Sequence, residues 1–160
     1  MFDEKLKKLS RILIEKNLKV ATAESCTGGL LASRFTDISG SSNFLNESHI
    51  TYANSAKHKY LGVSEEILNT VGAVSKECAF NMAKGLQKLS NCDVAICTTG
   101  IAGPTGGTKE KPVGLVYISV FYNGKITVNK YVLNKLIPRK LMKFLFTQKA
   151  IEMAYNIIQQ

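Results

Sequence analysis

The chain has 160 residues and a formal net charge of +9, with 45% hydrophobic and 21% charged residues. This is the composition of an ordinary globular protein, and it excludes an intrinsically disordered chain. No apolar run approaches the ~20 residues of a membrane-spanning helix, and the N-terminal segment lacks the apolar centre of a signal peptide. We therefore expect one cytoplasmic domain over residues 1–160 that does not bind a membrane.

The first 90 residues have a pattern that predicts helices alternating with strands. Apolar residues at intervals of three and four indicate helices, and short apolar runs beside glycine or asparagine indicate strands and turns. In chain order, we expect a helix over 3–17, a strand over 19–23, a helix over 28–36, a loop over 39–43, a strand within 44–53, and helices over 55–60, from 64 and from 75. The inner face of the helix from residue 75 is expected to carry Cys78, Met82, Leu86 and Leu89.

The rest of the chain predicts a buried strand, a hairpin and a long final helix. Residues 93–99 form a near-continuous apolar run, and Asn123-Gly124 is a hairpin signal between strands over 114–121 and 125–133. Pro138 opens a helix to about Ile158. Its inner positions are expected to include Leu141, Leu145, Ala150 and Ala154, with Phe144 and Phe146 in the same stripe. The fold class is therefore α/β: a three-layer α/β/α sandwich with a mostly parallel mixed sheet and an antiparallel hairpin near the C-terminus.

Two glycine-rich segments follow predicted strands, over residues 22–29 and 99–107. Ligands of parallel α/β sheets bind beyond the carboxyl ends of the strands, so both segments should lie on the same side. The second segment has the spacing of neither a P-loop nor GxGxxG, and two structural turns without a ligand are the alternative. Ser25 stands at a strand-to-helix turn, and we predict that it is a nucleophile. Cys26 is a rival nucleophile, although its side chain is expected to point elsewhere after the turn.

A serine nucleophile requires a group that accepts its proton. Neither His49 nor His58 is well placed in the sequence, whereas Tyr52 and Lys57 bracket a strand end and a turn. A lysine can act as a base when burial or a neighbouring cation lowers its pKa, and a tyrosine can relay a proton or orient the serine. Most lysines are solvated and most tyrosines at strand ends belong to the core, so the pattern alone favours that alternative.

The cysteines and histidines lack metal-binding spacing. Neither a CxxC pair nor a histidine with a neighbouring cysteine occurs among Cys26, Cys78, Cys92, Cys97, His49 and His58. We expect no metal and no other cofactor, and cysteines that are reduced.

A basic run without any acidic residue occupies positions 125–149. Its cations are Lys125, Lys130, Lys135, Arg139, Lys140, Lys143 and Lys149. Such a face can bind nucleic acid non-specifically, but it is equally typical of a solvated surface or of a site for a phosphorylated substrate. We expect that nucleic acid is not the main ligand.

Ordered sequence blocks across residues 20–120 resemble the CinA C-terminal domain family. The blocks are Ala23-Glu24-Ser25-Cys26-Thr27-Gly28-Gly29, Thr36-Asp37-Ile38-Ser39-Gly40-Ser41-Ser42, Thr51-Tyr52-Ala53-Asn54-Ser55-Ala56-Lys57, Leu61-Gly62-Val63, Gly72-Ala73-Val74-Ser75, Thr99-Gly100-Ile101-Ala102-Gly103-Pro104, Gly106-Gly107-Thr108 and Lys111-Pro112-Val113-Gly114. The resemblance implies a stand-alone nicotinamide mononucleotide deamidase, without the further domain of longer CinA proteins. Such an enzyme hydrolyses the carboxamide of its small-molecule substrate, nicotinamide mononucleotide, to nicotinate mononucleotide and ammonia.

The resemblance also implies a set of site residues. The family is similar to Ser/Lys amidohydrolases, and its Ser, Tyr and Lys match Ser25, Tyr52 and Lys57. Lys57, assisted by Tyr52, would take the Ser25 proton, and water would then hydrolyse the acyl-enzyme. The expected substrate-binding residues are Thr27, Gly28, Gly29, Thr99, Gly100, Ile101, Ala102, Gly103 and Arg139.

The two glycine-rich segments are expected to divide the work of binding the substrate. N–H groups at the start of the 27–36 helix, or those of residues 100–103, would stabilise the oxyanion. The other segment would hold the 5′-phosphate, with Thr99, Thr108, Arg139 or a lysine as partner. Which segment does which stays open.

The chain departs from the family pattern after residue 130. Ile137-Pro138-Arg139 stands where the family often has Gly-Asp-Arg, and Lys143 stands at the position of a later arginine. Contacts that this segment makes to a substrate or a subunit are therefore open, although edge strands and a basic final helix are compatible with a homo-oligomer. The alternative function is a non-catalytic nucleotide- or protein-binding module linked to competence or DNA damage.

Overall fold

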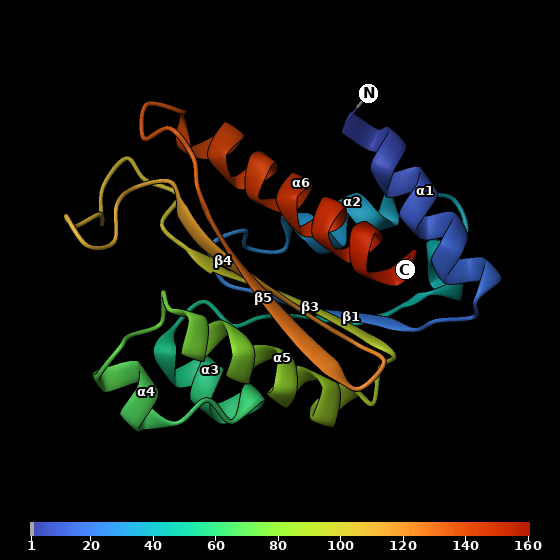
Figure 1. The fold of residues 1–160 in the computed structure, drawn as a ribbon, viewed down its shortest axis with the longest axis horizontal. Coiled ribbons are helices and arrows are strands. Elements are labelled where there is room, and N and C mark those ends of the chain that lie inside the picture. Colours follow the sequence, from blue (N-terminus) through green and yellow to red (C-terminus); the bar gives the residue numbers. More distant parts are fainter. Residues whose placement is uncertain (1) are drawn as a thin grey trace.

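A five-stranded mixed sheet forms the centre of the computed structural model, which describes residues 2–160 (Figure 1). Its strands, in spatial order, are β2 (Leu45–Ile50), β1 (Val20–Glu24), β3 (Val94–Gly100), β4 (Leu115–Tyr122) and β5 (Lys125–Val132). Strand β1 pairs in parallel with both β2 and β3, whereas β4 and β5 continue the sheet in antiparallel fashion. The parallel strands therefore end at one edge of the sheet, where loops carry the chain to the next element.

Helices cover both faces of this sheet, which confirms the predicted three-layer architecture (Figure 1). One layer contains α1 (Phe2–Glu15), α2 (Leu30–Thr36) and α6 (Arg139–Ile158). The other contains α3 (Asn54–Leu61), α4 (Glu65–Asn69) and α5 (Lys76–Ser90). The short 3-10 helix η1 (Ser41–Asn43) lies between α2 and β2, within the predicted loop. Among these helices of residues 2–160, none is both long and apolar enough to cross a bilayer.

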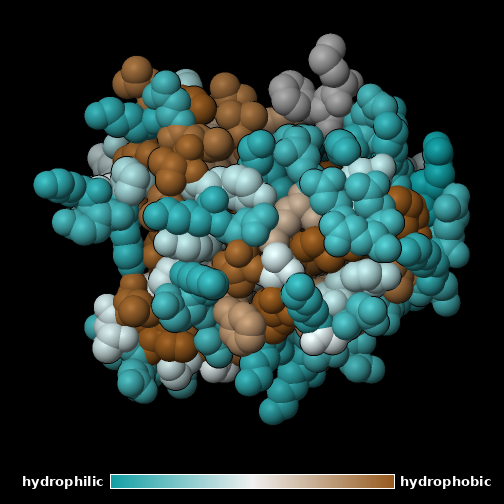
Figure 2. Space-filling view, viewed as in Figure 1, coloured by the Kyte–Doolittle hydropathy of each residue, from teal (hydrophilic) through white to brown (hydrophobic). Residues whose placement is uncertain are grey.

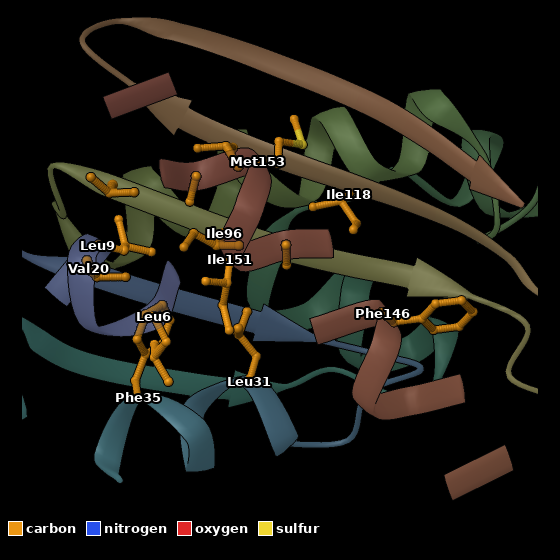
Figure 3. Packing of buried hydrophobic residues seen from close by; sticks show 14 of the residues in the cluster. Leu6, Leu9, Val20, Leu31, Phe35, Ile96, Ile118, Phe146, Ile151 and Met153 are labelled. Carbon is orange, nitrogen blue, oxygen red and sulfur yellow. The ribbon is translucent and has the colours of Figure 1, made fainter. Parts of the chain in front are cut away.

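The core has two halves because the central strands are covered on both faces. The larger half joins α1, α2 and α6 to the sheet through the side chains labelled in Figure 3, among them Leu9, Phe35, Ile96 and Ile151. The smaller half packs α5 against Ala21, Ala23, Ala95 and Cys97, whose small side chains let the helix approach the strands. All five residues of β1 are therefore buried, whereas buried and exposed residues would alternate in a strand with one solvent-facing side. This is usual for a parallel strand with helices on both faces of its sheet.

Close packing between α3 and α5 depends on one glycine. A Cβ atom at Gly85 would lie 1.7 Å from the carbonyl oxygen of Leu61, a distance that no side chain can occupy. The α3–α5 contact therefore requires a glycine at this position. This close contact holds α3 in its position against α5. Lys57, in the middle of α3, reaches the edge of the sheet from that position.

The predicted element boundaries agree with the structure to within a few residues, but some inner positions were wrong. Leu89 is exposed, because the buried stripe of α5 ends at Leu86. Leu141 is also exposed, and Leu145 and Phe144 are only half-buried. The buried stripe of α6 instead contains Met142, Phe146, Ala150, Ile151, Met153 and Ala154. Leu141 is one residue from Met142 and so points about 100° away from the core.

Candidate active site

A pocket of about 280 Å³ opens beyond the carboxyl ends of β1 and β3. The segments that line it come from the turn after β1, the β2–α3 connection, the approach to α5, the loop after β3 and the start of α6. The lining residues are Ser25, Cys26, Tyr52, Asn54, Lys57, Ala73, Val74, Thr99, Gly100, Ile101, Ala102, Gly103, Thr105, Gly106 and Arg139. The two glycine-rich segments thus meet at the same edge, where parallel α/β sheets bind ligands.

Ser25 and Lys57 are hydrogen-bonding neighbours in this pocket. The distance between Lys57 Nζ and Ser25 Oγ is 3.0 Å, although 32 positions separate the two residues in sequence. The Lys57 side chain is only 1% exposed. Its Nζ also donates to the carbonyl oxygens of Thr51 and Tyr52, each at 2.9 Å.

Parallel pairing of β1 and β2 explains how these residues meet. Ser25 follows the last residue of β1, and its N–H donates to the Thr98 carbonyl, which continues the β1–β3 ladder. On the other side, the Thr51 N–H donates to the Glu24 carbonyl and continues the β1–β2 ladder. Helix α3 starts three residues later, so that Lys57 turns back toward the end of β1.

Burial lowers the pKa of the Lys57 amine below its ordinary value of 10.5. None of the ion pairs formed by residues 2–160 involves Lys57, so no carboxylate offsets this loss of hydration. A neutral amine has two N–H groups and one lone pair. In that neutral form, the carbonyl oxygens of Thr51 and Tyr52 would accept from the two N–H groups, and the lone pair would face the Ser25 hydroxyl.

Tyr52 lies at the mouth of the pocket rather than between Ser25 and Lys57. Its side chain is 59% exposed, and its hydroxyl accepts a hydrogen bond from Arg139 Nη2 at 3.2 Å. Within the described chain, the phenol has no hydrogen bond to Ser25 or Lys57. The contact of Tyr52 with Lys57 is made by its backbone carbonyl. The expected proton relay through the phenol is therefore not the arrangement that the structure has.

The end of β3 and the loop after it form the opposite wall of the pocket. Gly100 has no room for a side chain, because a Cβ there would lie 2.5 Å from the Leu115 carbonyl oxygen. The Thr99 hydroxyl donates to the Ala73 carbonyl at 2.8 Å, which ties this wall to the segment before α5. Arg139 Nη1 donates to the Gly103 carbonyl at 2.7 Å, so one guanidinium bridges the loop and Tyr52.

The turn after Cys26 points away from the pocket, contrary to expectation. Thr27, Gly28 and Gly29 do not line it, and the buried Thr27 hydroxyl donates to Glu24 Oε1 at 2.6 Å. The first turn of α2 is also occupied, because the N–H groups of residues 31 and 32 both donate to the Glu24 carboxylate. These N–H groups cannot serve an oxyanion without losing their present acceptor.

Some residues near the pocket were not assigned a role from the sequence. Asn54, Ala73, Val74, Thr105 and Gly106 line it, and Glu24 lies buried behind the turn. The position of Asn54 and Val74 could not be derived from spacing, because it depends on how α3 and α5 pack. By contrast, the Thr108 hydroxyl accepts a hydrogen bond from the Lys111 N–H, and Thr108 is not among the lining residues.

Over residues 2–160, no cluster of three His, Cys, Asp or Glu side chains has the arrangement of a metal site.

Cys26 is the other nucleophilic side chain at this pocket, and burial raises its thiol pKa to about 12. Less than one thiol in a thousand is then ionised near pH 8, so we expect iodoacetamide to modify Cys26 roughly 10³ times more slowly than an exposed cysteine. Mass spectrometry of the native protein measures this rate, and the same protein in urea provides the control in which all four thiols react. Rapid modification of native Cys26 would show that its thiol is neither buried nor protonated in the folded protein.

Residues 3–158 match the family model described as the CinA C-terminal domain. A competence-damage inducible protein of Clostridium beijerinckii is 56% identical over 122 residues, which cover 76% of this chain and 30% of that protein. A CinA-like protein of Kosmotoga olearia is 46% identical over 155 residues, which cover 93% of this chain and 38% of that protein. The chain thus spans about a third of the length of the curated relatives it matches.

Solved structures share the whole fold. The crystal structure of the competence/damage inducible protein CihA from Agrobacterium tumefaciens has a TM-score of 0.90 and 39% identity, covering 100% of this chain and 99% of that one. A CinA superfamily protein from Klebsiella pneumoniae has a TM-score of 0.93 and 28% identity, covering 99% and 98% of the two chains. These names describe competence or damage and state no reaction.

Proposed function

The chain belongs to the CinA C-terminal domain family, and on this premise we propose that it is an amidohydrolase that converts nicotinamide mononucleotide to nicotinate mononucleotide and ammonia. The observation that carries the proposal is the 3.0 Å contact between Ser25 Oγ and the buried amine of Lys57 at the base of a pocket. A hydroxyl beside a neutral amine is a nucleophile paired with its base.

The proposed reaction has two stages. Lys57 takes the Ser25 proton while Ser25 Oγ bonds to the carboxamide carbon, and the resulting tetrahedral intermediate breaks its C–N bond. Lys57 returns the proton to the leaving nitrogen, so that ammonia departs and an acyl-enzyme remains. Water then adds to the ester with Lys57 again as the base, and Ser25 leaves as the hydroxyl. Each stage is a proton transfer and an acyl transfer, without any change of oxidation state.

We place the oxyanion among backbone N–H groups that have no carbonyl acceptor. Within residues 2–160, the N–H groups of Cys26, Ala102 and Gly103 donate to no backbone carbonyl, and all three residues line the pocket. The N–H groups of α2 are excluded because Glu24 accepts from them. The apolar side chains of Val74 and Ile101 suit the faces of a pyridine ring.

We place the phosphate at the mouth of the pocket, where the Arg139 guanidinium forms no ion pair with a carboxylate of residues 2–160. Its hydrogen bonds within this part of the chain are to neutral acceptors, the Gly103 carbonyl and the Tyr52 hydroxyl. Thr105 lines the same wall. A second cation, Lys143, follows one helical turn later, and its Nζ would lie 3.7 Å from a Cβ at Gly28. A guanidinium of this kind can bind two phosphate oxygens at once.

Replacing Arg139 with alanine is expected to raise KM for nicotinamide mononucleotide by about 10- to 100-fold, the value of one charge-assisted hydrogen-bonding group. Steady-state kinetics would measure the change, with exposed Lys140→Ala on the same helix as the matched control. Hydrolysis of nicotinamide riboside, which lacks the phosphate, should respond much less to Arg139→Ala. An equal loss with both substrates would place the phosphate elsewhere.

Release of ammonia from nicotinamide mononucleotide by the purified protein tests the function itself. Chromatography should show nicotinate mononucleotide in equal amount. Binding of the mononucleotide without turnover, under conditions where Ser25 and Lys57 are intact, would instead support the non-catalytic binding module.

We also propose that the chain forms a homo-oligomer. Figure 2 shows hydrophobic surface in the region where α6 begins, and the exposed Leu136 and Leu141 belong to this part of the chain. Light scattering on the eluted protein measures the mass, and a monomer at micromolar concentration would refute this proposal.

A further inference from the structure

Glu24 is a buried carboxylate that the proposed reaction does not use. It is the last residue of β1 and is 0% exposed. Its Oε1 accepts hydrogen bonds from Thr27 Oγ1 at 2.6 Å and from the Leu31 N–H at 2.8 Å, and its Oε2 accepts from the Ala32 N–H at 3.0 Å. The side chain therefore spans the whole turn that carries Ser25 and joins the end of β1 to the first turn of α2.

The backbone of the same residue is connected to Lys57. The Glu24 carbonyl accepts from the Thr51 N–H at 2.9 Å, and the Thr51 carbonyl in turn accepts from Lys57 Nζ at 2.9 Å. The Glu24 side chain is thus hydrogen-bonded to the turn that carries Ser25. Its main-chain carbonyl is hydrogen-bonded to Thr51, whose own carbonyl accepts from Lys57. A shift of Glu24 would move Ser25 and Lys57 relative to each other.

We propose that Glu24 is a positioning residue, whose carboxylate holds the Ser25 turn in register with Lys57. This inference rests on the proposed function, because it assigns Glu24 a role in the Ser25–Lys57 chemistry. Glu24 does not touch the pocket, since it is not among the lining residues, and it acts only through the turn and through Thr51.

Three donors converge on Glu24, and this explains why a carboxylate is required. A carboxylate only accepts hydrogen bonds, so it satisfies one hydroxyl and two N–H groups at once. The Thr27 hydroxyl, having donated to Glu24, can accept from Thr98 Oγ1 at 2.8 Å, which extends the network to β3. A glutamine at this position would replace one carboxylate oxygen by an NH₂ group, which cannot accept a hydrogen bond. That group would face either the Ala32 N–H, or both the Thr27 hydroxyl and the Leu31 N–H. The amide would therefore release part of the turn while keeping almost the same volume.

The experiment compares Glu24→Gln with Ser64→Ala. Ser64 caps α4 through a bond from the Ile67 N–H and lies outside the pocket, so its loss weakens a helix end without touching the turn. Turnover of nicotinamide mononucleotide is measured well below the melting temperature of each variant. We expect Glu24→Gln to lower kcat by about 100-fold with KM changed by less than about threefold, since a displacement near 1 Å costs this much in rate. Ser64→Ala should lower the melting temperature and leave kcat unchanged.

A second measurement separates this inference from the identity of the substrate. The rate at which a small sulfonyl fluoride modifies Ser25, followed by mass spectrometry, depends on the Ser25–Lys57 pair and does not require the mononucleotide. If the wild type is modified at Ser25 but does not hydrolyse the mononucleotide, the proposed substrate is wrong. Slower modification of Glu24→Gln would still support the positioning role in that case.

Two results would overturn the inference. One is a Glu24→Gln variant whose kcat and Ser25 modification rate stay within about threefold of the wild type. The other concerns Thr27→Val, which removes one of the three donors and is measured instead if Glu24→Gln does not fold. That variant is expected to lower both rates by several-fold, and unchanged rates would contradict the role of the network.

Discussion

Replacing Ser25 with alanine is expected to reduce the release of ammonia from nicotinamide mononucleotide by roughly 10³-fold or more. Removal of a nucleophile eliminates the acyl-enzyme route, and losses of this size or larger are usual when a nucleophile that acts together with its base is deleted. Among the described residues, Ser25 Oγ has one hydrogen bond, to Lys57 Nζ, so the substitution removes one hydrogen bond from the fold. An ammonia assay under saturating substrate measures the loss, and the binding of substrate should persist.

Cys26→Ala is the matched control for Ser25→Ala. Both positions line the pocket and both substitutions remove one γ atom, but the pKa of Cys26, raised to about 12, keeps its thiol protonated. We expect Cys26→Ala to retain kcat within a few-fold. Full activity in Ser25→Ala, or a comparable loss in both variants, would contradict Ser25 as the nucleophile.

The order of helices and strands was predictable because the spacing of apolar residues along the chain shows which positions are buried. The alternation of helices with strands, and Asn123-Gly124 as the turn between β4 and β5, follow from local patterns in the sequence. The inner face of α6 was not predictable in the same way. Apolar residues occur all around that helix, so its sequence does not distinguish the buried Met142 from the exposed Leu141. Only packing against the sheet and α1 decides between them.

The candidate site was predictable where it depends on strand ends, and not where it depends on side-chain direction. The segments after β1 and β3 had to reach one edge of the sheet, and Ser25 and Cys26 of the first line a pocket there together with residues 100–103 of the second, although Gly28 and Gly29 do not. The roles of Tyr52 and Glu24 were beyond the sequence. A tyrosine two residues beyond β2 can point either inward or outward, and the structure has its phenol at the exposed mouth. A glutamate at the end of a strand is usually solvated, whereas Glu24 is buried because the start of α2 supplies it with N–H donors.

The buried amine of Lys57 makes both activity and stability depend on pH. Only the neutral amine can take the Ser25 proton, so kcat/KM should rise with pH until Lys57 is deprotonated, at a pKa below 10.5 because burial lowers it. Below that pKa the amine is protonated and cannot act as the proposed base. Lys57→Arg keeps a cation that stays protonated at any accessible pH, so we expect it to remain inactive from pH 6 to 10.

Lys57→Met should change the pH dependence of folding in a defined direction. When the folded-state pKa of a lysine is lowered, the unfolded chain binds more protons between that pKa and 10.5, so the free energy of unfolding rises with pH across this window. The contribution is at most about 1.4 kcal/mol per pH unit for one group. Lys57→Met lacks the titrating amine, so the wild type should gain stability relative to it as pH increases. Urea unfolding of both proteins at several pH values between 7 and 10 measures this difference. Parallel curves for the two proteins would mean that Lys57 has the same pKa in the folded and unfolded chains, and the neutral base on which the proposed mechanism depends would then be ruled out.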